Sequence, residues 1–137
     1  MATSATISTI INAPIDKVWD YYTKPEHIMH WNNASEDWHT PKAENDLREG
    51  GKFLSRMESK DGTEGFDFTG VYTKVVDNSF IEYVMDDGRK VSVVMNAEDV
   101  NTEIQVQFDL ETQNSEELQR QGWQAILDSF KKYVETN

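Results

Sequence analysis

The sequence predicts an α+β fold in which a curved antiparallel sheet wraps around a long C-terminal helix. From residue 38 onward, apolar side chains recur at every second position in short segments separated by turn residues, which is typical of antiparallel strands. Residues 115–134 change to a helical period and carry one apolar stripe. Consecutive strands that end in a helix favour α+β over an alternating α/β fold. Because the stripe and one face of the sheet are both apolar, we expect each to cover the other.

The N-terminal part of the chain predicts one strand and two short helices. Residues 6–12 alternate and are β-branched, which indicates a strand. Pro14 and Asp16 then mark the start of a helix, and Pro25 marks the start of a second one over residues 25–31. The apolar face of the first helix consists of Ile15, Val18, Trp19 and Tyr22.

The middle of the chain predicts antiparallel strands joined by tight turns. These strands are residues 35–47, as an irregular polar edge, and residues 51–59, 65–76, 80–85, 90–97 and 102–110. Asp61-Gly62 is a typical hairpin turn. The predicted inward face of residues 65–76 consists of Phe66, Phe68, Gly70, Tyr72 and Val76. The predicted inward face of residues 102–110 consists of Thr102, Ile104, Val106, Phe108 and Leu110.

The C-terminal helix contains an unusual glycine. Its apolar stripe consists of Trp123, Ile126, Leu127, Phe130 and Val134. Gly122 precedes this stripe, and a glycine inside a helix costs about 1 kcal/mol relative to alanine. We therefore expect a structural reason at Gly122: either another backbone approaches closely, or space is left open on the side of the sheet.

Length, charge and composition limit the classes of function. A chain of 137 residues is expected to form one domain over residues 1–137. The net charge of −12 disfavours nucleic acid and anionic membranes as partners. The absence of cysteine excludes disulfides and thiolate chemistry. The sequence shows neither a signal peptide nor a membrane span, so we expect a cytoplasmic protein with no membrane insertion.

Several motifs together resemble the START-like SRPBCC superfamily, and within it the group of the activator of Hsp90 ATPase homologue-like proteins. They are the segment Asn-Ala-Pro-Ile-Asp-Lys-Val-Trp-Asp at 12–20, Trp31, Leu-Arg-Glu-Gly-Gly-Lys-Phe at 47–53, Gly-Val-Tyr at 70–72, and Gly122-Trp123 with Leu127 and Tyr133. The resemblance implies a helix-grip fold, in which a curved antiparallel sheet of six or seven strands grips the C-terminal helix and two short helices follow the first strand. Folds of this kind host ligand carriers, co-chaperone domains and enzymes alike.

Residues for metal or acid–base chemistry are few. His27, His30 and His39 lie close together in the sequence, but a zinc site needs three or four convergent ligands, so we expect no metal and no cofactor. Histidines exposed or at an interface are the better interpretation. No Ser/His/Asp order and no nucleotide-binding glycine loop occurs, and the candidate acid–base residues in strands are Arg56, Asp67, Lys74 and Glu82. Whether the protein is an enzyme stays open, with binding favoured.

The binding hypothesis rests on an aromatic and methionine-rich interior beneath the terminal helix. The candidate ligand-binding residues are Trp31, Phe53, Met57, Phe66, Phe68, Tyr72, Tyr83, Met95, Phe108, Trp123 and Leu127, with Val106 beside them. Tyr72, Tyr83, Ser55 and Asn96 are candidates for the polar contacts that orient a small hydrophobic ligand, aromatic or lipid-like. This interior either packs solid or leaves a pocket.

Two other functions stay open at this point. One is a co-chaperone-type module that binds a heat-shock chaperone, although an acidic surface offers no evident attraction toward an acidic partner. The other is a cyclase- or aromatase-like enzyme. A monomer or a weak dimer is expected, because the charges of the edge at residues 35–47 work against pairing with a second copy.

Overall fold

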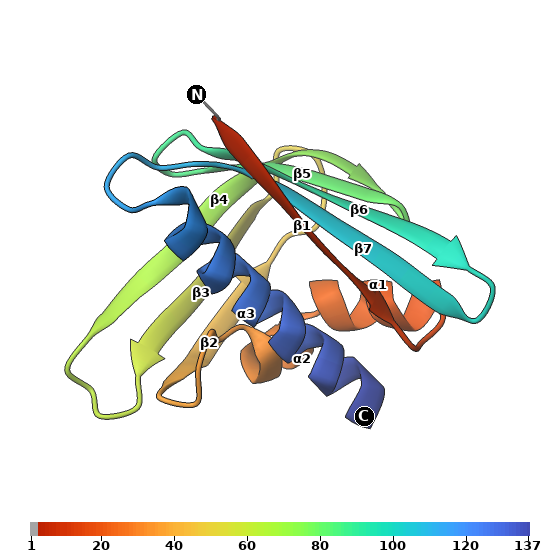
Figure 1. Ribbon diagram of the computed structural model, residues 1–137, viewed down its shortest axis with the longest axis horizontal. Helices are drawn as coiled ribbons and strands as arrows, with labels where there is room; N and C mark the ends of the chain where they lie inside the picture. The colour runs from red at the N-terminus through yellow and green to blue at the C-terminus, as the bar shows by residue number, and fades with distance from the viewer. Residues whose placement is uncertain (1–2) are drawn as a thin grey trace.

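The computed structural model describes residues 3–137 and confirms the predicted α+β helix-grip fold (Figure 1). Residues 1–2, which the predicted domain includes, lie outside the described residues. The elements are β1 (Ser4–Ile11), α1 (Ile15–Thr23), α2 (Pro25–Trp31), β2 (Trp38–Asn45), β3 (Lys52–Ser59), β4 (Gly65–Val76), β5 (Phe80–Met85), β6 (Lys90–Glu98), β7 (Asn101–Asp109) and α3 (Glu116–Thr136).

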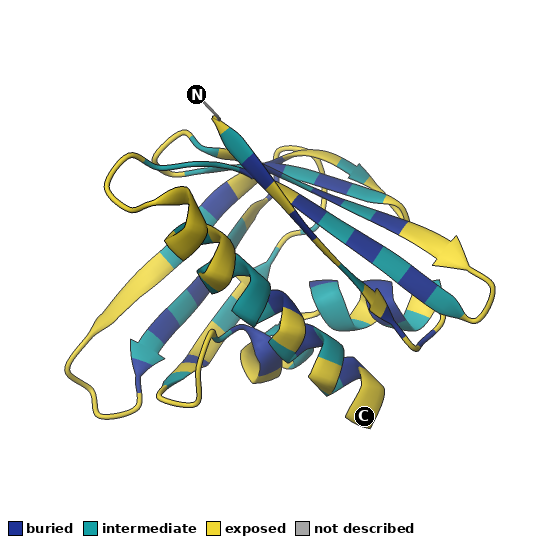
Figure 2. Cartoon of the chain, viewed as in Figure 1, coloured by how far each residue is buried: buried dark blue, intermediate teal, exposed yellow. Residues whose placement is uncertain are grey.

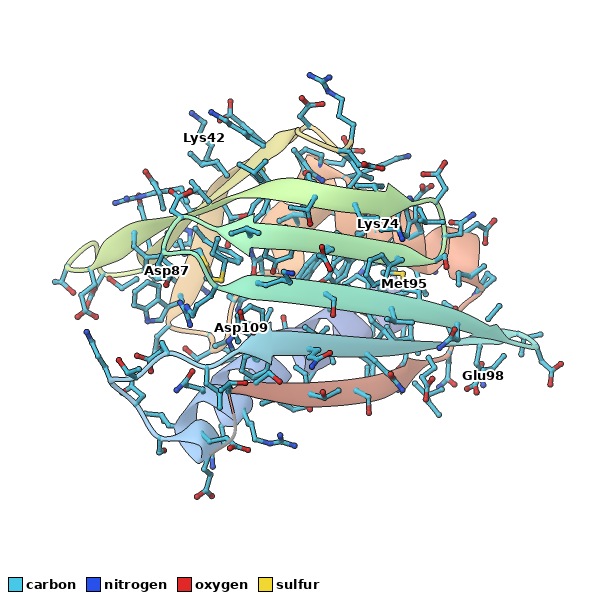
Figure 3. All side chains as sticks on the ribbon, turned by 90° about the horizontal axis from the view of Figure 1, so that it is seen from above. Lys42, Lys74, Asp87, Met95, Glu98 and Asp109 are labelled. Carbon is cyan, nitrogen blue, oxygen red and sulfur yellow. The ribbon has the colours of Figure 1, made fainter. Side chains whose placement is uncertain are left out.

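The sheet has seven antiparallel strands in the order β1-β7-β6-β5-β4-β3-β2. Strands β2 to β7 form a meander, and β1 joins it by pairing with β7. β1 and β2 follow each other in the chain but therefore lie at opposite edges of the sheet, and α1 and α2 connect them. Figure 1 shows α3 lying across the concave side of the curled sheet, with α1 and α2 near its C-terminal end. Seen from above in Figure 3, the strands lie side by side with the helices behind them.

Helix α3 is capped at its N-terminus and buried over its C-terminal half. The Ser115 hydroxyl accepts a hydrogen bond of 3.1 Å from the backbone N–H of Leu118, which satisfies one free amide of the first turn. Leu127, Phe130 and Val134 are buried, as the predicted stripe requires. Trp123 and Ile126, earlier on the same stripe, are only partly buried (Figure 2). The helix therefore contacts the core more closely at one end than at the other.

The histidines of α2 lie at an interface between helices. His27 Nδ1 lies 2.7 Å from the hydroxyl oxygen of Tyr133 on α3, and the rings of His30 and Tyr133 stack with centroids 5.6 Å apart. Tyr21 of α1 stacks on His27 at 3.9 Å. These contacts join the three helices at the C-terminal end of α3. No helix among residues 3–137 is long and apolar enough to cross a membrane.

The prediction that Val76 faces inward is wrong. The register between β4 and β5 shifts between Tyr72 and Lys74, which reverses the faces of the residues that follow. Val75 consequently packs against the core opposite Ile81, and Val76 is 43% exposed. Strict alternation in the sequence could not reveal this bulge. The other predicted inward residues of the strand, from Phe66 to Tyr72, keep their face.

We predict that Thr102→Val lowers the free energy of unfolding by about 1–3 kcal/mol. The fully buried Thr102 hydroxyl donates a hydrogen bond of 2.9 Å to the carbonyl of Ala13, so valine would leave that carbonyl unpaired between β1 and α1. Urea unfolding measures the change. Thr6→Val, on the exposed face of β1, is the matched control and should change stability by less than about 0.5 kcal/mol. Equal losses in both variants would contradict this role of Thr102.

We also predict that Gly122→Ala raises the free energy of unfolding by about 0.5–1 kcal/mol. A Cβ at this helical position would meet nothing within 4 Å, so alanine gains helix propensity without a clash. Gly88 also has free space around it, but its φ of +91° is strained for alanine. Gly88→Ala should therefore destabilise by about 1 kcal/mol in the same urea experiment. A destabilised Gly122→Ala variant would show that another constraint acts on the helix.

Candidate functional site

A cavity of about 520 Å³ lies between the concave face of the sheet, α2 and α3. Aromatic and aliphatic side chains form most of its walls. The lining residues are Ile7, Tyr22, Ile28, Trp31, Asn32, Ala34, Ser35, Trp38, Phe53, Ser55, Met57, Phe66, Phe68, Tyr72, Tyr83, Met85, Val106, Gln119, Gly122, Trp123, Ile126 and Leu127.

Gly122 lies on the side of α3 that faces the cavity. Gln119, Gly122, Trp123, Ile126 and Leu127 all line it, and their spacing places them on one face of the helix. Any side chain at Gly122 would therefore project into the cavity or its border, where nothing lies within 4 Å of a Cβ. Of the two reasons expected for this glycine, the structure shows open space and not a close backbone.

Trp123 forms one wall of the cavity and covers the core behind it. Its ring stacks on Phe108 with centroids 4.6 Å apart and an interplanar angle of 11°. The edge-to-face contact with Phe68 has a centroid distance of 6.4 Å. Phe108 is fully buried behind the indole and does not line the cavity. Trp123 thus separates the solid core from the open space.

Trp31 fixes the opposite wall. Its indole N–H donates a hydrogen bond of 2.8 Å to the carbonyl of Tyr21, which ties α2 to α1. Its ring stacks on Tyr22 at 5.1 Å and meets Phe130 of α3 edge-on at 4.9 Å. Because Trp31 is buried and held by all three helices, it gives the cavity a rigid end.

The structure brings most of the predicted binding residues together around the cavity. Those that line it are Trp31, Phe53, Met57, Phe66, Phe68, Tyr72, Tyr83, Trp123 and Leu127. Met95 is only 2% exposed and lies opposite Ile104 in the solid part of the core, so it does not line the cavity. Asn96, a predicted polar contact, is exposed on β6 and bonds to Glu103 instead. That these residues bind a ligand stays a prediction.

Three tyrosines contribute polar hydroxyl groups to the lining of the cavity. We call Tyr22, Tyr72 and Tyr83 the phenol cluster. Tyr72 donates a hydrogen bond to Asn45 Oδ1, and the Asn45 amide donates to the carbonyl of Thr23. Burial raises the pKa of all three phenols, and the neighbouring phenols raise the pKa of Tyr72 and Tyr83 further. All three therefore stay protonated and neutral at physiological pH.

Several polar groups on the walls have no hydrogen-bond partner within residues 3–137. Among them are the hydroxyls of Tyr22, Tyr83 and Ser55 and the side-chain amide of Asn32. Asn32 is 6% exposed, Ser55 5% and Tyr83 7%, so these groups are nearly removed from bulk water. In the described chain, every side-chain nitrogen or oxygen that is inaccessible to solvent has a hydrogen-bond partner. The unpaired groups on the walls are therefore accessible from the cavity. They are available to whatever fills it.

Sequence reasoning missed Asn32 and Tyr22 as lining groups. Asn32 follows the last residue of α2, where the hydroxyl of Thr40 donates a hydrogen bond of 2.6 Å to its carbonyl and anchors the chain to β2. From the sequence, a polar residue directly after a short helix is interpreted as a C-terminal helix cap and not as a lining residue. Tyr22 was predicted on the apolar face of α1, and only the packing of α1 against the sheet places it at the cavity. The position of neither side chain follows from a local pattern.

The cavity opens where β4 passes the segment after α2. Phe66 is 49% exposed, and its ring lies 6.0 Å from that of Trp38. Ala34 and Ser35 are exposed and also line the cavity here. On the α3 side, the Gln119 amide donates hydrogen bonds to the carbonyls of Glu111 and Asn114, which holds the loop before the helix. The opening is therefore bordered by aromatic rings and neutral side chains.

Comparisons with known proteins place this geometry in a family. The family model described as "Activator of Hsp90 ATPase homolog 1-like protein" matches residues 12–135. The AHSA1-like protein from Aeromonas hydrophila, solved by NMR, is 45% identical with a TM-score of 0.89, over 96% of this chain and 93% of that one. A protein from Cytophaga hutchinsonii is 50% identical with a TM-score of 0.83, over 96% and 92%.

A third solved structure and the curated proteins complete the comparison. A crystal structure from Chromobacterium violaceum has a TM-score of 0.87 at 19% identity, over 98% of this chain and 99% of that one, and shows the shared fold alone. No curated protein matches this chain. Because the family model covers nearly the whole chain, from Asn12 to Glu135, the chain belongs to the family of activator of Hsp90 ATPase homolog 1-like proteins.

Proposed function

We propose that the protein binds a small hydrophobic molecule, aromatic or lipid-like, in the cavity between the sheet and α3. The observation that carries this proposal is the cavity itself, with a volume of about 520 Å³ and mainly apolar walls. Pockets for small molecules commonly measure about 300–1,000 Å³ and combine apolar walls with a few polar groups. Leu127, Phe130 and Val134 pack solidly next to the cavity, so the open space is confined to one part of the helix.

The groups on the walls support binding over turnover. General acid–base catalysis relies mostly on histidine and carboxylate side chains within hydrogen-bond reach of the substrate. Among the described residues, the cavity is lined by neutral side chains only. The raised pKa values of the phenol cluster keep its members in the protonated form, which suits hydrogen bonding better than proton abstraction.

We predict that flavonoid-like or fatty compounds shift the amide NMR signals of cavity-lining residues in a titration. Gly122→Phe should weaken every ligand that binds the wild type by about tenfold or more, because the new ring occupies the open space beside Trp123. Gln121→Phe is the control, since Gln121 is exposed and does not line the cavity. It should leave the affinities unchanged. If no compound class shifts these signals, the binding proposal is wrong.

A second candidate follows from family membership: stimulation of the ATPase of an Hsp90-type chaperone. Contact with a chaperone would use the outer surface, so the Gly122→Phe variant should be as active as the wild type in this reaction. The measurements are co-precipitation with the cognate chaperone and ATP turnover at saturating protein. Unchanged turnover together with no co-precipitation would reject this candidate and leave the binding proposal untouched.

A further inference from the structure

The ligand can be specified more closely from the unpaired groups of the cavity. Tyr83 on β5 is 7% exposed, lines the cavity and has no hydrogen-bond partner for its hydroxyl among residues 3–137. Tyr22 of α1 presents a second such hydroxyl, next to Trp31. Because both hydroxyls are open to the cavity, each is available for a hydrogen bond with a polar group of the occupant.

The contacts of the rings hold these hydroxyls in place. Tyr83 packs edge-to-face on Phe53 at 4.8 Å and on Tyr72 at 6.2 Å. Tyr22 is fixed between Trp31 at 5.1 Å and Phe130 at 5.0 Å. Because neighbouring rings restrict both side chains, their hydroxyls are positioned before a ligand enters. Such pre-organisation lowers the entropy that binding would otherwise cost.

The chemistry of the walls matches a neutral polar group. A phenol hydroxyl can donate and accept a hydrogen bond, and so can the Ser55 hydroxyl and the Asn32 amide. These groups complement a hydroxyl or a carbonyl. They offer no positive charge to an anion: within the described chain, no lysine, arginine or histidine lines the cavity. An ionised carboxylate would lose its hydration without gaining a counter-charge, and the protein charge of −12 opposes its entry.

We infer that the cavity selects an uncharged ring-containing ligand whose hydroxyl or carbonyl group pairs with Tyr22 and Tyr83, and that it discriminates against the corresponding carboxylate. This inference rests on the proposed function and specifies the ligand of the same cavity. It separates neutral aromatic compounds from fatty or aromatic acids, which share the apolar body but differ in charge. Tyr22 and Tyr83 are then the residues that determine specificity.

The test uses three probes with the same two-ring body: naphthalene, 2-naphthol and 2-naphthoate, titrated at pH 7.5 and followed by amide NMR shifts. We expect 2-naphthol to bind most tightly and 2-naphthoate to bind about tenfold or more weakly than 2-naphthol. The double variant Tyr22→Phe/Tyr83→Phe should lose about tenfold in affinity for 2-naphthol and change its affinity for naphthalene by less than about twofold.

The control is Tyr133→Phe, which removes a hydroxyl outside the cavity that lies 2.7 Å from His27. It should leave all three affinities unchanged. If 2-naphthoate binds as tightly as 2-naphthol, or if the double variant keeps its preference for 2-naphthol, the inference is wrong while the proposed function stands. If none of the probes shifts the cavity signals, and the flavonoid-like and fatty compounds also fail, both are wrong.

Discussion

The architecture depends on the contact between a straight helix and a curled sheet. Strands twist and coil, so the concave face of a large sheet cannot follow a straight helix along its whole length. In this protein the C-terminal half of α3 closes onto the sheet and the short helices, with Phe130 and Val134 fully buried. The N-terminal half is less buried, and Trp123 covers the core there by stacking on Phe108. The cavity is the space that this geometry leaves.

Keeping that space open has a physical cost. Protein interiors are normally close-packed, and side chains beside a void lose dispersion contacts. Here the void is also bordered by hydroxyl and amide groups that have no hydrogen-bond partner in the described chain. A larger residue in place of Gly122 could have filled part of it at once. The open volume, the unpaired groups and the helical glycine occur at one place. Together they support the proposed ligand over inefficient packing as the explanation.

The relatives bear on the fold more than on the cavity. Proteins 45% and 50% identical share the architecture over nearly the whole chain, and so does a structure at only 19% identity. Apolar alternation and the capped terminal helix are enough to specify such a fold, because many side chains satisfy the same pattern. The identity of cavity-lining residues is a separate property, which the fold does not dictate. Under the proposed binding function, the ligand preference of this protein is therefore expected to depend on a few wall residues.

The sequence by itself determined the secondary structure, the inward faces of the strands and the partnership between α3 and the sheet. These features follow from local periodicity, which is written directly in the chain: β4, β5 and α2 have the predicted bounds. Periodicity also found most cavity residues, because the cavity and the core share one apolar face. It failed at Val76, where a bulge reverses the alternation, and it could not tell that the inward Met95 lies in the solid core. Asn96 was a wrong candidate for a polar contact, since alternation itself places it on the face opposite Met95.

Only the tertiary structure decided whether the interior is solid or open, and which polar groups face the opening. The hydroxyl of Tyr22 and the amide of Asn32 reach the cavity because α1 and α2 connect β1 and β2 across the sheet, a long-range arrangement without a local signal. Gly122 and Trp123 show the same division. The sequence marked the glycine as costly in a helix, and the curvature of the sheet beneath it explains why the position is empty.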